Sequence, residues 1–133
     1  MWELKGIFAV LLAWFLGLDL AYKCLAVLMV LDMAVALGRA IVLRTLDRRV
    51  AFLGVLKKAL VWMVVSACAA MTIFFRESFG ASVPAGPAVA CLFCGHEFVS
   101  ILTNAREAGV WLPKPLIQAL EAFEAQFDGP PVK

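Results

Sequence analysis

The stretch AVACLFCGHEFVSILTNAREAGVWLPKPL, residues 88–116, decides the fold class of this chain. It starts as an apolar helix and then gains polar residues along one face while its other faces stay apolar. At 100° per residue these polar residues fall within an arc of about 120°. They are His96, Glu97, Ser100, Thr103, Asn104 and Glu107. Such a helix suits a membrane segment that has lipid on one side and water or another helix on the other.

The composition favours a membrane protein over a soluble one. The 133 residues are 64% hydrophobic and 17% charged, whereas soluble domains are about 45–50% apolar and about 25% charged. A small soluble domain cannot bury so much apolar surface, because its surface is large relative to its volume. We therefore predict an all-α integral membrane protein, with a single membrane domain over residues 1–128 and a tail at 129–133.

Three segments, at 20–43, 59–75 and 88–104, are predicted transmembrane helices. A further apolar run at 7–18 is shorter than the roughly 20 residues that a span needs. It predicts a short N-terminal helix, and the sequence leaves open whether this helix is a fourth span. Beyond a glycine and two prolines, residues 116–127 place apolar side chains on one face and acidic side chains on the other. This pattern predicts an amphipathic C-terminal helix.

Basic residues gather from the end of the first predicted span to the start of the second, and they indicate the orientation in the membrane. Their set is Arg39, Arg44, Arg48, Arg49, Lys57 and Lys58. Because cytoplasmic loops are enriched in lysine and arginine, we predict a cytoplasmic basic loop here. The 76–87 loop is then external and the C-terminus cytoplasmic, while the side of the N-terminus depends on residues 7–18. A nucleic-acid site is not expected, because both flanks are apolar enough for a membrane.

Polar residues inside the predicted spans are the candidate functional residues. A carboxylate within a span is costly, so Asp32 should face the bundle interior or water. We predict a set that lines a pore or forms polar helix contacts: Asp32, His96, Glu97, Ser100, Thr103 and Asn104. Small residues allow helices to approach closely. The predicted packing set of this kind is Ala36, Gly38, Ala40, Ser66 and Ala70.

Cysteine and histidine near the start of the quoted stretch raise the question of a metal or haem site. The spacing is Cys91-x-x-Cys94-x-His96, whereas covalent haem attachment needs histidine directly after the second cysteine. Zinc requires a fourth ligand, and on a helix Cys94 points about 160° away from His96. We therefore predict no metal, no cofactor and no catalytic residue, and we do not expect an enzyme.

Three stretches of the chain resemble the toxin-secretion and phage-lysis holins, a family that includes clostridial toxin-release holins. They are VLMVLDMAVALGRAI (27–41), AFLGVLKKALV (51–61) and EFVSILTNAREAGVWLPKPLIQALE (97–121). The family typically has Leu-Asp and then a glycine, where this chain has Asp32 and Ala36. It also tends to show Glu-x-x-Ser-Ile-x-Glu-Asn, where Thr103 stands at the second acidic position.

The resemblance implies a phage protein that accumulates in the host bacterial inner membrane and forms a homo-oligomeric lesion or pore. Its direct partners would then be membrane lipid and other copies of itself. An endolysin would be its functional partner, and this partnership requires no direct contact. Related proteins export toxins. The residues also permit another interpretation, in which a non-pore membrane scaffold or accessory subunit recruits a partner through its basic loop and acidic tail. Dye release from liposomes separates these two functions.

Overall fold

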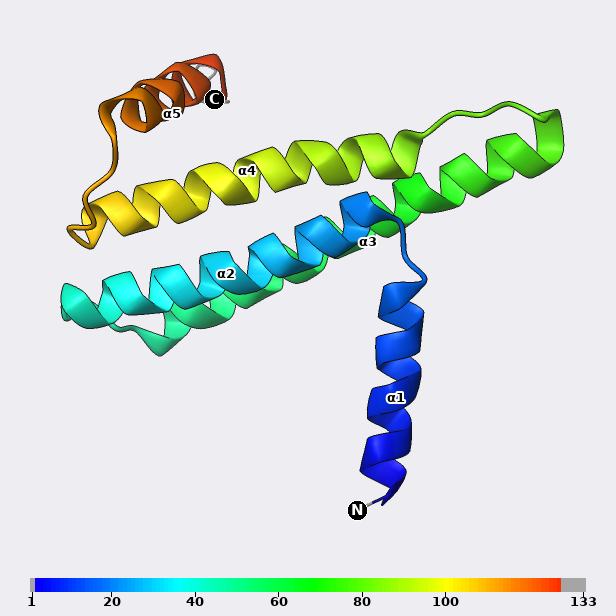
Figure 1. Cartoon of the computed structure of the whole chain (residues 1–133), viewed down its shortest axis with the longest axis horizontal. Helices are drawn as coiled ribbons and strands as arrows, with labels where there is room; N and C mark the ends of the chain where they lie inside the picture. The colour runs from blue at the N-terminus through cyan, green and yellow to red at the C-terminus, as the bar shows by residue number, and fades with distance from the viewer. Residues whose placement is uncertain (1, 128–133) are drawn as a thin grey trace.

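The computed structural model describes residues 2–127, and five helices account for most of them (Figure 1). The helices are α1 (Trp2–Leu16), α2 (Leu20–Val42), α3 (Arg48–Phe79), α4 (Ala85–Glu107) and α5 (Lys114–Phe127). No strand occurs among the described residues, and the predicted all-α fold is confirmed. The predicted tail at 129–133 lies outside the described residues.

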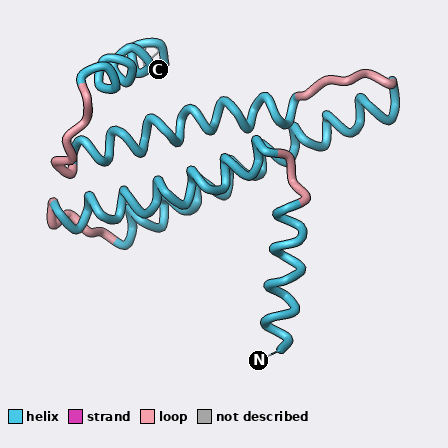
Figure 2. The backbone as a smooth tube through the Cα atoms, viewed as in Figure 1, coloured by secondary structure: helices cyan, strands magenta, loops and turns pink. Residues whose placement is uncertain are grey.

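Helices α2, α3 and α4 form an elongated three-helix bundle (Figures 1 and 2). The chain runs along α2, returns along α3 and runs back along α4, so α2 and α4 are parallel to each other and antiparallel to α3. All three helices are long and apolar enough to cross a membrane. The prediction of three transmembrane helices is therefore confirmed, and the protein is a multi-pass membrane protein.

The bundle core is small and consists of Leu25, Met29, Val65 and Ala90. Helix α4 supplies its part of this core by packing against both α2 and α3. Most other large apolar side chains of the three helices are exposed. Because such a surface is stable in hydrocarbon and not in water, the exposed belt of the bundle is suited to contact with lipid or with other apolar helices.

The three helices come into close contact at Gly86, in the first turn of α4. A Cβ atom at this position would overlap the Tyr22 hydroxyl of α2 and would lie 2.7 Å from the Ala69 Cα of α3. The Gly86 N–H, which has no partner within its own helix because it lies in the first turn, donates to the Thr72 hydroxyl at 2.9 Å. Glycine at this position therefore allows the close contact.

Helix α1 stands apart from the bundle and runs across its long axis (Figure 1). Its described apolar side chains are exposed. The helix covers Trp2–Leu16 instead of the predicted 7–18. It begins early because Glu3 in the first turn interacts favourably with the helix dipole, and it ends before Gly17. It is not among the described helices that are long and apolar enough to span.

The predicted basic loop is mostly helix. Only residues 43–47 separate α2 from α3, and Arg44 has a positive φ of 55° in this turn. The Asp47 side chain caps α3 by accepting a hydrogen bond from the Arg49 N–H at 2.8 Å. This cap allows the helix to start at Arg48, so α3 spans Arg48–Phe79 instead of 59–75. Arg39 lies in α2, and the other four basic residues of the predicted loop lie in α3.

Helix α2, Leu20–Val42, matches its prediction of 20–43 to within one residue, whereas α4 and α5 start earlier than predicted. Helix α4 covers Ala85–Glu107 instead of 88–104, and α5 starts at Lys114 instead of residue 116. Both early starts contain a proline, Pro87 or Pro115, in the first helical turn. Proline is tolerated there because the N–H groups of that turn need no partner within the helix.

Helix α5 folds back over the outer side of α4. Leu120 is buried in this contact, and Phe123 lies 3.9 Å from a Cβ built at Gly95. The Thr103 hydroxyl lies 3.2 Å from a carboxylate oxygen of Glu124, to which it donates a hydrogen bond. An ion pair of 3.6 Å joins Arg106 and Glu121, which reinforces the attachment.

Candidate functional site

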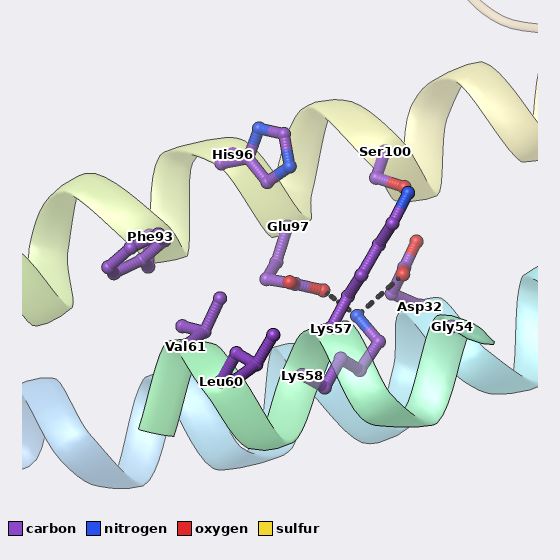
Figure 3. A pocket seen from close by; sticks show the side chains of 10 residues that line it. All are labelled: Asp32, Gly54, Lys57, Lys58, Leu60, Val61, Phe93, His96, Glu97 and Ser100. Atoms are coloured by element: carbon purple, nitrogen blue, oxygen red, sulfur yellow. Dashed lines mark hydrogen bonds and ion pairs between the residues drawn. The ribbon is translucent and has the colours of Figure 1, made fainter. Parts of the chain in front are cut away.

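One lysine and two carboxylates meet between the three spans. The Lys58 ammonium of α3 donates to the Asp32 Oδ2 atom of α2 at 2.8 Å and also to the Glu97 Oε2 atom of α4 (Figure 3). Their side-chain exposures are 15% for Lys58, 10% for Asp32 and 5% for Glu97. These three residues form a buried ion cluster, to which every helix of the bundle contributes one charge.

The ion cluster lies deep within the spans. Asp32 is ten residues before the end of α2, Lys58 ten residues after the start of α3, and Glu97 ten residues before the end of α4. At 1.5 Å per residue, each charge is about 15 Å from the same end of the bundle. Helices α2 and α4 have 23 residues each, so this depth is close to the middle of both helices.

A polar side chain of α4 completes the hydrogen bonding of Asp32. The Asn104 Nδ2 group donates to Asp32 Oδ1 at 3.3 Å and lies 3.4 Å from the Ser100 hydroxyl. Each oxygen of the Asp32 carboxylate therefore has its own donor, one from α3 and one from α4. Buried charges are tolerated when they are paired and hydrogen-bonded in this way.

The ion cluster ties the three spans together more specifically than apolar packing can. In lipid, helices gain nothing from the hydrophobic effect by associating, so close packing and polar contacts hold them together. Removing one member of a buried ion pair costs about 3–5 kcal/mol, because the other charge is left without a partner. The ion cluster therefore fixes which helices pair and at which level they pair.

An open pocket of about 470 Å³ lies beside the ion cluster, between α3 and α4 (Figure 3). Lys57 and His96 line it and are exposed, and Ser100 lines it from a half-buried position. Figure 3 shows the His96 ring directed away from the three charges, while Lys57 extends from α3 in the direction of α4. The pocket joins the buried charges to the outer surface of the bundle.

The structure divides the predicted polar set into three groups. Asp32, Glu97 and Asn104 meet at the ion cluster. His96 and Ser100 line the pocket. Thr103 instead faces α5, where it donates to Glu124. A role in lining a pore stays a prediction for each of them.

The sequence pattern assigns Lys58 to the basic loop, and the structure corrects this assignment. The tight turn brings α3 back along α2, and this geometry places Lys58 opposite Asp32. The sequence does contain a signal for the pairing, since Asp32 lies thirteen residues before Thr45 and Lys58 thirteen residues after it. In an antiparallel hairpin with a short turn at Thr45, the two charges must lie at the same level.

Three of the five predicted small residues, Gly38, Ser66 and Ala70, are exposed within the single chain. A Cβ atom added at Gly38 would have no atom within 4 Å. Ala36 and Ala40 are half-buried. The sequence-based assignment misses Gly86, where the close approach occurs. The predicted small residues could pack separate copies of the chain against each other only through exposed positions, and such contacts between copies stay a prediction.

These features define a small multi-pass membrane protein whose three spans enclose the buried ion cluster. The sequence profile of the bacteriophage holin family matches residues 9–125, so the chain belongs to that family. The family consists of membrane proteins of phage lysis that are not enzymes. This match confirms the resemblance to phage holins that the sequence motifs indicate. No curated protein and no solved structure matches the chain.

Proposed function

We propose that this holin oligomerises in the host bacterial inner membrane and forms a lesion there. The lesion depolarises the membrane and releases or activates an endolysin, which then degrades the cell wall. The observation that carries the proposal is the ion cluster of Lys58, Asp32 and Glu97, buried near the middle of α2 and α4 in a chain of the holin family. Export of a toxin through the same lesion is a further use of the same activity.

The ion cluster supports an inert state that accumulates before the lesion forms. With its charges paired inside the bundle, a single chain presents mainly apolar side chains to lipid. Such a chain inserts without opening a path for ions, because polar groups inside a membrane are stable when they satisfy one another. The bundle can therefore reach a high density in the membrane while the membrane stays intact.

The small core supports the second step, which is assembly. Few residues are buried within the bundle, and large exposed apolar side chains cover α2 and α3. In lipid, contacts within one chain and contacts between chains are of the same kind and similar strength. At high density, contacts between copies therefore compete with the packing of the single bundle, and an oligomer that surrounds water becomes accessible.

Timed expression in bacteria tests the proposal. Induction of the intact chain is expected to produce a delayed and abrupt loss of membrane potential, recorded with a potential-sensitive dye, followed by lysis when an endolysin is present. Asp32→Leu and Glu97→Leu remove one charge each and should shift the time of depolarisation. The control Met33→Leu alters an exposed apolar residue next to Asp32 and should keep the original timing.

Two results would contradict the proposal. Unchanged timing in both charge variants would remove the ion cluster from the mechanism. Insertion of purified protein into dye-loaded liposomes without any leakage would instead favour the scaffold function, in which the chain recruits a partner and forms no lesion.

A further inference from the structure

The exposed belt of the bundle is apolar at the level of the ion cluster, except on one side. On α2, the side chains around Asp32 that face outward are Val30, Leu31 and Met33. On α3, Val55 and Leu56 are exposed close to the level of Lys58, and neither lines the pocket. These surfaces suit the hydrocarbon of the bilayer, so nothing on them requires water.

The exception is the mouth of the pocket between α3 and α4. Lys57 lies nine residues from the start of α3, and His96 lies eleven residues from the end of α4. Both side chains are exposed. Within residues 2–127, neither makes an ion pair or a hydrogen bond.

This position is unfavourable for contact with lipid. At 1.5 Å per residue, Lys57 lies about 14 Å and His96 about 16 Å from the end of the bundle. Lysines near helix ends reach the interface with their long side chains, but Lys57 is almost as deep as the ion cluster. A charged lysine level with the middle of the two neighbouring spans is costly to place in hydrocarbon, and such residues face water or protein.

We propose that the mouth of this pocket, formed by Lys57, His96 and Ser100, is the surface that faces water in the assembled lesion. Helix α2 and the side of α3 that carries Leu56 then face lipid or neighbouring copies. The inference rests on the proposed lesion and adds to it the side of each chain that lines the lumen. It also separates the residues that contact water from the ion cluster, which holds the bundle together.

Cysteine labelling tests this assignment in living cells. The starting variant replaces the four native cysteines with alanine and must still depolarise the membrane. Single cysteines are then placed at Lys57 and His96, with matched controls at Leu56 and Phe98, which are exposed on other faces of the same helices at similar depth. A membrane-impermeant, sulfonated thiol reagent is added before and after depolarisation, and labelling is measured by mass shift.

After depolarisation, we expect labelling at Lys57→Cys and His96→Cys to be at least about tenfold faster than at the controls, because a thiolate forms readily in water and poorly in apolar surroundings. Before depolarisation, all four positions should stay unlabelled. His96→Cys is an independent reporter if the loss of charge in Lys57→Cys prevents assembly, and Ser100→Cys is a third.

The results separate this inference from the proposed function. Depolarisation with equal labelling at all positions, or with faster labelling at Leu56→Cys and Phe98→Cys, overturns the lumen assignment and leaves the lesion intact. Depolarisation without labelling at Lys57→Cys or His96→Cys also overturns it and places a protein contact on this face. If the starting variant and the intact chain both fail to depolarise the membrane, the lesion itself is wrong and the lumen assignment falls with it.

Discussion

At the scale of single residues, Lys58 has the most demanding position in the chain. It pairs with one carboxylate from each of two other helices, near the middle of both. Replacing it by methionine keeps the length of the side chain but leaves Asp32 and Glu97 close together without a cation. We expect Lys58→Met to lower the free energy of unfolding by about 3–5 kcal/mol, because the two remaining charges are buried without a partner. Denaturation in detergent micelles, followed by circular dichroism, measures this change.

The neighbouring lysine provides the control for this prediction. Lys57 is exposed and has no partner within the described chain, so Lys57→Met should change the free energy of unfolding by no more than about 0.5 kcal/mol. A triple variant, Lys58→Met with Asp32→Asn and Glu97→Gln, should regain most of the lost stability, because it removes the unpaired charges. Equal stability of Lys58→Met and Lys57→Met would show that the ion cluster does not hold the helices together.

Gly86 allows a separate prediction about the packing of α4. Alanine at Gly86 would place its Cβ against the Tyr22 hydroxyl and the backbone of Ala69, so α4 must move away from both neighbours. We expect Gly86→Ala to destabilise the bundle by about 1–3 kcal/mol. Gly95→Ala on the same helix meets only Phe123, at ordinary contact distance, and gains helix propensity. It should be neutral or stabilising in the same denaturation experiment, and a larger loss for Gly95→Ala would contradict this account.

At the scale of the helices, the sequence predicts their number and type well but predicts their ends less well. The three spans follow from apolar composition and length, which are properties of each segment alone. The start of α3 is harder to place because Arg48 and Arg49 are typical of a loop when only charge is considered. Their helical conformation depends on the cap that Asp47 provides, and a cap of this kind is decided by backbone geometry.

The partner of each carboxylate in the ion cluster is harder to predict from the sequence than the need of these carboxylates for a partner. Asp32 and Glu97 are expected to make polar contacts because a buried carboxylate needs a partner. Which partner they have depends on the register of the helices, and apolar spans contain little information about register. The equal spacing of Asp32 and Lys58 from the turn at Thr45 fixes the register of the first hairpin only. The position of α4 depends on Gly86, whose role becomes apparent only in three dimensions.

Helix α5 is held to α4 by a small contact, which gives a prediction at this scale. Leu120 is the buried residue of this contact, and it is supported by the hydrogen bond between Thr103 and Glu124. Leu120→Ser should release α5 while the three spans stay folded, because local opening requires the loss of few contacts. Hydrogen exchange in micelles should show at least about tenfold faster exchange in α5 and no change in α2.

The matched control for this change is Ala119→Ser, which alters the exposed neighbour of Leu120. Its α5 amides should exchange as slowly as those of the unaltered chain. Faster exchange throughout α2 and α4 in Leu120→Ser would mean that α5 is part of the bundle and not a separate, weakly attached element.

At the scale of the whole molecule, the two ends of the bundle differ in charge, and this difference predicts the orientation. Arg44 lies in the turn between α2 and α3, and Arg48 and Arg49 are the first two residues of α3. Arg39 and Arg106 lie in the last turns of α2 and α4 at the same end. At the opposite end Arg76 pairs with Glu77. Because positive charges are retained in the cytoplasm, the first end should be cytoplasmic and the loop at 80–84 external.

Reporter fusions test this orientation. Alkaline phosphatase, which is active only outside the cytoplasm, should be active when inserted after Ser82, whereas a green fluorescent protein joined after α5 should fluoresce inside the cell. Replacing Arg44, Arg48 and Arg49 by glutamine should give a mixture of both orientations, because the charge difference between the ends then becomes small. The opposite result for the unaltered chain would place Arg44 outside. It would reverse the direction of the bundle while leaving the ion cluster at the same depth, since that cluster lies about 15 Å from the end of the bundle whichever way the chain is inserted.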